Sequence, residues 1–168
     1  MKFLQKLFSK GTDEHGGDAS VSSEMTLVLF KPDAVEKNLV GESLRRYQEE
    51  GFIIRGIKMM ELTPELLAEH YSHITDRPFY PRLIQFMTSA PVIALALEGP
   101  NVIARVREIL GATDSTQADE GTIRKDYGIN SMFNICHASD SPEAAEVELK
   151  RFFKEGEIYS FHSHDYLK

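Results

Sequence analysis

Asn134-Ile-Cys-His137-Ala-Ser139-Asp140-Ser141-Pro142 forms a short apolar strand that ends in a histidine and leads directly into a helix start. Ser141 is a preferred N-cap residue, and Pro142 suits the first helical position. A histidine at this junction is held by a sheet and faces the positive end of a helix. That position favours a neutral ring able to act as nucleophile or base near pH 7. An isolated strand-end histidine is more often structural, so its role depends on the residues that accompany it.

Apolar strands alternate with helices outward from this junction. Strands are expected at residues 25–30, 52–60 and 91–97 and in the segment that carries His137. Helices are expected from Val40 to a stop at Gly51, from Thr63-Pro64 onward, around 83–87, at 102–110 up to Gly111, and at 142–153. Residues 112–133 are expected to be a long loop, which in a compact domain is usually functional.

The order β-α-β-α-β-α-β-α predicts an α/β chain of the α+β sandwich type. The ferredoxin-like split βαβ fits it best, with a four-stranded antiparallel sheet covered by helices on one face. A small doubly wound parallel sheet is the rival. The chain contains neither a G-x-G-x-x-G loop nor a Walker loop, which disfavours that rival.

Composition limits the classes of function. The 168 residues predict one domain, and the formal charge of -7 disfavours bulk binding of nucleic acid. Cys136 is the single cysteine, which excludes disulfide scaffolds and cysteine zinc sites and favours a reducing, cytoplasmic setting. No apolar run approaches the ~20 residues of a membrane helix, so stable membrane insertion is not expected.

The N-terminus differs in composition from the rest. Residues 1–24 are predicted to be a flexible extension and residues 25–168 the folded domain, and Met25 is a possible alternative start. Weak surface anchoring or partner docking is the alternative for the extension, because its apolar residues share one face opposite lysines. Those apolar residues are Phe3, Leu4, Leu7 and Phe8.

Four motifs occur in a fixed order along the folded part. They are Leu29-Phe-Lys31-Pro-Asp33, Arg77-Pro-Phe79, Gly121-Thr-Ile-Arg124 and Asn134-Ile-Cys-His-Ala-Ser-Asp-Ser141. Their order and spacing resemble those of nucleoside diphosphate kinases, from about Met25 to about Phe161. The resemblance implies a ping-pong phosphotransferase that maintains nucleoside triphosphate pools. His137 would accept the γ-phosphoryl group of a nucleoside triphosphate, typically ATP, and pass it to a nucleoside diphosphate.

The resemblance also implies the roles of individual residues. Glu148 would fix the tautomer of His137, with Ser139 supporting that contact, while Lys31 and Tyr71 would position the transferred phosphate. The remaining nucleotide-binding residues would be Arg107, Thr113 and Arg124 for the phosphates, Asn134 for the ribose, and Phe79 and Leu83 for the base. Mg²⁺ would bridge the phosphates with few or no direct protein ligands.

Several alternatives stay open at this point. A silent nucleotide-binding module and a protein-histidine phosphotransfer component are the rival functions. A hexamer is expected by resemblance, and a tetramer is its main rival. Several other residues near the motifs are expected to have structural rather than chemical roles. Cys136 is expected in the core, His70 in a structural role and Asp33 in a turn. His162 and His164 are expected to form a solvated tail rather than a metal site.

The chain departs from the usual family pattern beside the motifs. Ala138 stands where glycine is common, and Met132-Phe133 stands where many members have Gly-Arg. Ser131 replaces an apolar residue that packs near the base, and the loop 113–120 is divergent. These departures concern base packing and assembly, because the nucleophile and the phosphate ligands are intact.

Overall fold

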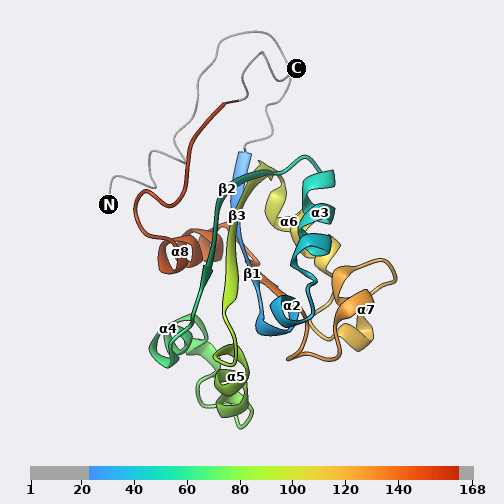
Figure 1. Ribbon diagram of the computed structural model, residues 1–168, viewed down its shortest axis with the longest axis vertical. Coiled ribbons are helices and arrows are strands. Elements are labelled where there is room, and N and C mark those ends of the chain that lie inside the picture. The colour runs from blue at the N-terminus through green and yellow to red at the C-terminus, as the bar shows by residue number, and fades with distance from the viewer. Residues whose placement is uncertain (1–22, 163–168) are drawn as a thin grey trace.

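The computed structural model describes residues 23–162 (Figure 1). The predicted extension therefore lies outside the described residues except for Ser23 and Glu24, which already belong to the first strand. His164, one half of the H-x-H pair, also lies outside them, while His162 is exposed.

Four antiparallel strands form one sheet in the order β2-β3-β1-β4. They are β1 (Ser23–Phe30), β2 (Ile53–Met60), β3 (Val92–Pro100) and the short β4 (Cys136–Ala138). All three strand pairs are antiparallel, which confirms the ferredoxin-like prediction and excludes the doubly wound parallel rival. β3 runs through Gly99 and Pro100, where the sequence predicted its end.

Helices cover both faces of the sheet, so the prediction of helices on one face was wrong. Figure 1 shows α3 (Val40–Glu49) and α6 (Val102–Leu110) on one side and α8 (Pro142–Phe152) on the other. α4 (Pro64–His70) and α5 (Tyr80–Met87) pack with α8 in the second core. The reason lies in β1, whose Val28 and Phe30 enter the first core while Leu27 and Leu29 enter the second.

The helix boundaries follow their capping residues. Ser141 Oγ accepts a hydrogen bond from Ala144 N at 3.1 Å, and Thr63 Oγ1 accepts one from Leu66 N at 3.2 Å, as the sequence predicted. Gly111 ends α6 with a φ of 88°, a conformation that favours glycine. These residues fix where α8 and α4 begin and where α6 ends.

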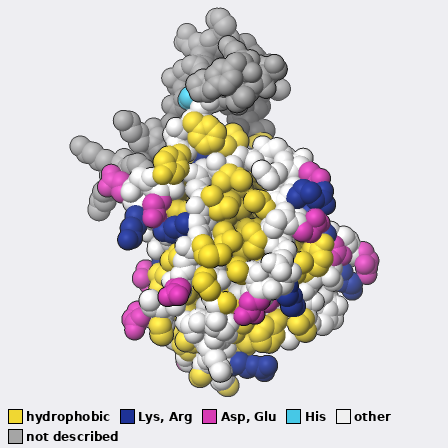
Figure 2. All heavy atoms as spheres, in the orientation of Figure 1, with side chains coloured by type: hydrophobic (Ala, Val, Ile, Leu, Met, Phe, Trp, Pro, Cys, Tyr) yellow, Lys and Arg dark blue, Asp and Glu magenta, His cyan; other side chains and the backbone are white. Residues whose placement is uncertain are grey.

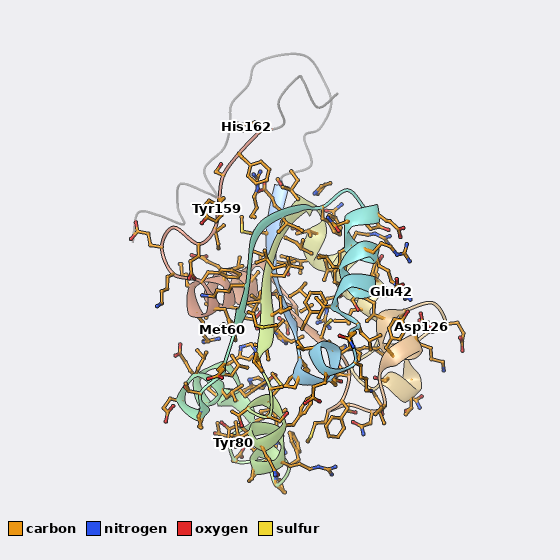
Figure 3. The ribbon with its side chains drawn as sticks, in the orientation of Figure 1. Glu42, Met60, Tyr80, Asp126, Tyr159 and His162 are labelled. Atoms are coloured by element: carbon orange, nitrogen blue, oxygen red, sulfur yellow. The ribbon has the colours of Figure 1, made fainter. Side chains whose placement is uncertain are left out.

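The segment predicted as one long loop contains two short helical pieces, η2 (Ser115–Gln117) and α7 (Ile123–Tyr127). Arg46 of α3 holds α7 in place, because its guanidinium contacts Asp126 of α7 at 2.8 Å and is oriented by Glu42 of its own helix at 3.2 Å. Glu42 and Asp126 are labelled in Figure 3. Two further short elements were also not predicted: α2 (Pro32–Glu36) and η1 (Ser72–Ile74).

β2 is an edge strand with an apolar outer surface. Ile53, Ile57 and Met59 are 39%, 51% and 59% exposed, and Figure 2 shows an apolar patch on the face that β2 presents to the viewer. The C-terminal segment runs beside the same strand, where Tyr159 N donates to the carbonyl of Arg55 at 2.8 Å. Across residues 23–162, no helix combines the length and hydropathy that crossing a bilayer requires.

Candidate active site

One cavity of about 670 Å³ collects most of the residues that the sequence singled out. Its walls come from β1, α4, α5, α6, α7, β4 and the loops between them. The predicted residues that line it are Lys31, Tyr71, Phe79, Leu83, Arg107, Thr113, Arg124, Asn134 and His137. Glu148 and Ser139 do not line the cavity and instead contact each other and His137 behind it, so the structure brings together all the predicted site residues.

His137 is held through one nitrogen of its ring. Its Nε2 lies 2.9 Å from Glu148 Oε1, while Ser139 Oγ donates to the other carboxylate oxygen at 2.6 Å. Leu27 N in turn donates to Ser139 Oγ at 3.2 Å, which ties the network to β1. Both oxygens of Glu148 are therefore engaged, and Nδ1 is the ring nitrogen that Glu148 leaves free for chemistry.

The carboxylate of Glu148 stays ionised although it is buried. Burial raises the pKa of Glu148, but the hydrogen bonds from His137 and Ser139 outweigh burial and leave the pKa below its ordinary value. Glu148 lies within α8, whereas the first turn of that helix is already capped by Ser141. The expected contact of the ring with the positive helix end is thus replaced by a contact with a mid-helix carboxylate.

Lys31 and Asn134 form a buried hydrogen-bonded pair in the wall of the cavity. Lys31 Nζ donates to Asn134 Oδ1 at 2.6 Å and to the carbonyl of Met132 at 3.2 Å. Asn134 Nδ2 donates to the carbonyls of Thr113 and Ser131, each at 2.9 Å. Burial, reinforced by the positive charge of Arg124, lowers the pKa of Lys31 to about 8.

A strained turn separates Asn134 from His137. Ile135 has a φ of 73°, rare for a β-branched residue, and Cys136 N donates to the carbonyl of Asn134 at 2.8 Å across it. Asp33 Oδ2 accepts a hydrogen bond from Ile135 N at 3.1 Å, and Lys31 N donates to the carbonyl of Ile135 at 2.9 Å. The backbone after β1 thus holds this turn in the conformation that places Asn134 and His137 on one pocket.

Asp33 does more than the turn role predicted for it. Its Oδ1 accepts from Ala34 N at 3.1 Å within its own turn, as expected, and its Oδ2 reaches across to Ile135. Burial raises the pKa of Asp33 despite these hydrogen bonds. Cys136 is fully buried in the core, as predicted, and burial likewise raises the pKa of its thiol.

Arg124 lines the cavity and also donates hydrogen bonds to the backbone. Its guanidinium donates to the carbonyls of Asn134, Gly111 and Cys136 at 3.3, 3.0 and 2.8 Å. It therefore ties α7 to the end of α6 and to the strand that carries His137. Arg107 is exposed and contacts the carbonyl of Ala138 at 3.4 Å, so it is the freer of the two arginines.

His70 and Tyr71 stand beside the nucleophile at the end of α4. The His70 ring lies edge-on to the His137 ring, with centroids 4.7 Å apart, and also contacts Phe152 at 5.0 Å. Burial and the proximity of His137 lower the pKa of His70 to about 3, so this ring is neutral. Tyr71 is half-buried, and burial raises the pKa of its hydroxyl.

The opposite end of the cavity is more open. Phe79 is 47% exposed at the start of α5, while Leu83 of the same helix is buried. Phe133 packs edge-on against Phe86 with centroids 4.6 Å apart, and Arg82 lies 5.8 Å above its ring. Met132 and Phe133, two of the residues that depart from the pattern of the resembled family, form part of this wall.

Sequence reasoning missed several lining residues, namely Ile74, Arg82, Asn130 and Asp140. Asn130 could have been predicted as a turn residue, because Asn side chains favour turns. In the structure its Oδ1 accepts hydrogen bonds from Met132 N at 2.9 Å and from Phe133 N at 3.0 Å. Arg77, quoted in a motif, is exposed and does not line the cavity. Arg82 is the arginine that this part of the chain contributes.

Comparisons with known proteins agree with the geometry. The family model described as nucleoside diphosphate kinase matches residues 24–158. The chain is 48% identical over 132 residues to the nucleoside diphosphate kinase of Acetivibrio thermocellus, covering 79% of this chain and 97% of that protein. It is 49% identical over 138 residues to that of Persephonella marina, covering 82% and 99%.

Solved structures of the same kind superpose closely. A nucleoside diphosphate kinase from Aquifex aeolicus gives a TM-score of 0.78 at 45% identity, covering 82% of this chain and 99% of that one. A halophilic one from Halobacterium salinarum, in complex with CDP, gives 0.81 at 38% identity, covering 84% and 94%. The chain therefore belongs to the nucleoside diphosphate kinase family of phosphotransferases.

Proposed function

We propose that this protein works by a ping-pong mechanism in which Nδ1 of His137 carries the phosphoryl group. The observation that supports this most directly is the 2.9 Å contact between His137 Nε2 and Glu148, because it leaves Nδ1 unpaired on a ring that lines the cavity. The Nδ1 lone pair attacks the γ-phosphorus, and the bond to the β–γ bridging oxygen breaks as the nucleoside diphosphate leaves. A second nucleoside diphosphate then takes the group from Nδ1.

Glu148 and Ser139 set up this attack without touching the phosphate. The carboxylate keeps the imidazole proton on Nε2 and stabilises the positive charge that spreads over the ring once Nδ1 is phosphorylated. Ser139 fixes the second carboxylate oxygen at 2.6 Å, so that Glu148 has one orientation. No separate base is needed, because the acceptor is an anionic phosphate.

The positive charges of Lys31, Arg107 and Arg124 balance the negative charge of the reacting phosphates. Phosphoryl transfer passes through a loose transition state, so the site mainly aligns the reactants and balances charge. Arg107 and Arg124 supply guanidinium donors to phosphate oxygens, and Lys31, with Tyr71, positions the transferred group. Thr113 contributes a hydroxyl at the same end, and Asn134 meets the ribose.

Mg²⁺ is the cofactor that this chemistry calls for. Asp140 is the sole carboxylate among the described cavity-lining residues, whose other charged members are the cations Lys31, Arg82, Arg107 and Arg124. That donor set fits an ion that arrives bound to the nucleotide phosphates rather than one held by a protein cage. When bound, the ion neutralises charge on the β- and γ-phosphates.

The base has an open apolar slot. Phe79 stacks on one base face and Leu83 packs nearby, contacts that any base can make. The Halobacterium salinarum relative was solved with CDP, which agrees with a nucleoside diphosphate ligand in this family. Broad base acceptance follows, and it suits an enzyme that maintains triphosphate pools in the cytoplasm.

We expect the protein to act as a homo-oligomer, with a hexamer as the first choice and a tetramer as its rival. Ile53, Ile57 and Met59 give the edge strand β2 an exposed apolar surface, which is typical of a strand that pairs with another copy. Sedimentation of the wild type and of Met59→Lys tests this. A wild-type monomer contradicts the proposal.

The decisive experiment is incubation with γ-labelled ATP and Mg²⁺ followed by denaturation. An acid-labile, base-stable label is expected on the wild type and not on His137→Ala, together with conversion of GDP to GTP. No label on the folded wild type contradicts the mechanism and favours a silent binding module. Label without transfer to GDP favours a protein acceptor instead.

A further inference from the structure

Three potential metal ligands converge directly behind the nucleophile. His70, His137 and Glu148 each offer one ligand atom, and these atoms lie within 4.8 Å of one another. We propose that the three side chains form an inhibitory site for a divalent transition-metal ion, best matched by Zn²⁺. The binding itself stands on geometry alone, and only its inhibitory effect rests on the proposed function.

The distances are close to those of a zinc site. Glu148 Oε1 lies 2.9 Å from His137 Nε2 and 3.9 Å from His70 Nδ1. Zinc bonds of about 2.0–2.1 Å in a tetrahedron separate two ligand atoms by roughly 3.3 Å. These two distances differ from that separation by roughly half an ångström. The two imidazole nitrogens lie within 4.8 Å of each other, so side-chain shifts of up to about 1.5 Å bring the three atoms around one ion.

The His70 ring would give up little hydrogen bonding on binding an ion. It is 7% exposed, and its Nε2 makes no hydrogen bond within residues 23–162. Its Nδ1 has only a long contact of 3.4 Å with Arg151, whose Nε is already paired with Glu69 at 3.1 Å. Arg151 keeps that partner if the ion takes the lone pair of His70.

The donor set distinguishes this ion from the magnesium of the nucleotide. Two imidazoles and one carboxylate form a common protein ligand set for Zn²⁺, whereas Mg²⁺ prefers oxygen ligands. His137 lines the cavity, so a water molecule can reach the fourth position of the ion. The sequence analysis preferred a solvated tail to a metal site at His162 and His164, and the partly buried set proposed here comes from α4, β4 and α8.

Occupation of the site should slow phosphoryl transfer. To bind the ion, Nε2 of His137 gives up the proton that Glu148 holds there, and that proton moves to Nδ1. Nδ1 then has no free lone pair with which to attack the γ-phosphorus, and Glu148 is engaged with the ion. The inhibition should be reversible, because no covalent bond is made to the protein and a chelator removes the ion.

The test uses the full chain without nucleotide, titrated with Co²⁺ as a spectroscopic substitute for Zn²⁺. The wild type should bind roughly one equivalent with the visible absorption of a four-coordinate site, and Zn²⁺ should displace it. His70→Phe, which keeps an aromatic ring against Phe152, should weaken binding at least about tenfold, as should His70→Gln. His73→Gln is the matched control, because this exposed histidine lies three residues away.

A second readout links binding to chemistry. Zn²⁺ should suppress labelling of His137 in the wild type and in His162→Gln/His164→Gln, but about tenfold more Zn²⁺ should be needed in His70→Phe. EDTA should restore labelling. Equal Co²⁺ binding by wild type and both His70 variants overturns the proposal, as does binding that disappears only with His162→Gln/His164→Gln. Cobalt binding is read without nucleotide, so its failure is distinct from a failure of the labelling experiment.

Discussion

The two ends of the cavity are built in different ways. At the phosphate end, Lys31, Arg124 and Asn134 are buried, and each makes hydrogen bonds to backbone carbonyls. At the base end, Phe79 is 47% exposed, and the side chain of Phe133 packs edge-on against Phe86. In the proposed mechanism, the rigid part meets the phosphates that all substrates share, and the more loosely packed part meets the variable base.

The rigid end has a cost in stability. Cations are buried near one another, and Ile135 is held at a φ of 73°. The base end carries neither burden. Substitutions at the phosphate end should therefore change stability or the chemical step by more than substitutions at the base end change nucleotide binding.

The largest effect should be the pH dependence that Lys31 imparts to stability. Its pKa is lowered to about 8 in the folded protein from 10.5, so between those values the unfolded chain binds more protons and stability rises with pH. The contribution of Lys31 to the free energy of unfolding should become more favourable by up to about 3 kcal/mol from pH 7 to pH 10. Urea unfolding of wild type and Lys31→Met at both pH values measures it.

The difference between the two proteins isolates Lys31 from other groups whose titration contributes in this range, including the thiol of Cys136, which titrates here in the unfolded chain. If the free energies of unfolding of wild type and Lys31→Met change in parallel with pH, burial does not lower the pKa of Lys31. The phosphate end would then carry less of the stability cost that distinguishes it from the base end.

Glu148→Gln should reduce the rate of His137 phosphorylation by about 10- to 100-fold while nucleotide affinity stays nearly constant. Glutamine keeps the shape of the side chain but removes the charge that stabilises the ring. Single-turnover labelling and equilibrium nucleotide binding separate the two quantities. Glu146→Gln, an exposed position on the same helix, is the control. A collapse of nucleotide affinity in Glu148→Gln contradicts the positioning role.

Asp33→Asn should lower the free energy of unfolding by about 1.5 kcal/mol, because an amide nitrogen cannot accept one of the two backbone hydrogen bonds. Release of Ile135 from its turn should also slow labelling of His137. Chemical denaturation gives the stability, and Asp76→Asn, an exposed carboxylate, is the control. Unchanged stability and labelling show that the turn holds itself without Asp33.

The strand order and the catalytic contact were predictable because their signals are local or specific. Ser141 and Pro142 predict the start of α8, and the motifs around His137 and Lys31 identify the family. The conformation of Ile135 could not be predicted, since a β-branched residue favours extended backbone and its restraint comes from Asp33, far away in the sequence. Such restraints exist only once the sheet has formed.

Other errors have similarly physical causes. α7 has five residues, too few for a helical period, and Arg46 of another helix holds it in place. The apolar run of β1 was correctly predicted to be a strand, but such a run does not reveal whether helices cover one face of the sheet or both. The sequence predicted that Arg124 binds phosphate but not that it hydrogen-bonds to three backbone carbonyls, because those contacts depend on tertiary structure.

The smallest effect should come from Phe79→Ala. A fully stacked base contributes about 1–3 kcal/mol, and the exposure of Phe79 places it at the low end, so KM should rise roughly fivefold with little change in kcat. Steady-state kinetics with several nucleoside diphosphates measures this, with Phe161→Ala, exposed outside the cavity, as control. The rise should be similar for purines and pyrimidines, because Leu83 and the wall that carries Phe133 remain. A loss of kcat as large as that of Glu148→Gln means that the base end also aligns the phosphates, and the two ends then act as one unit.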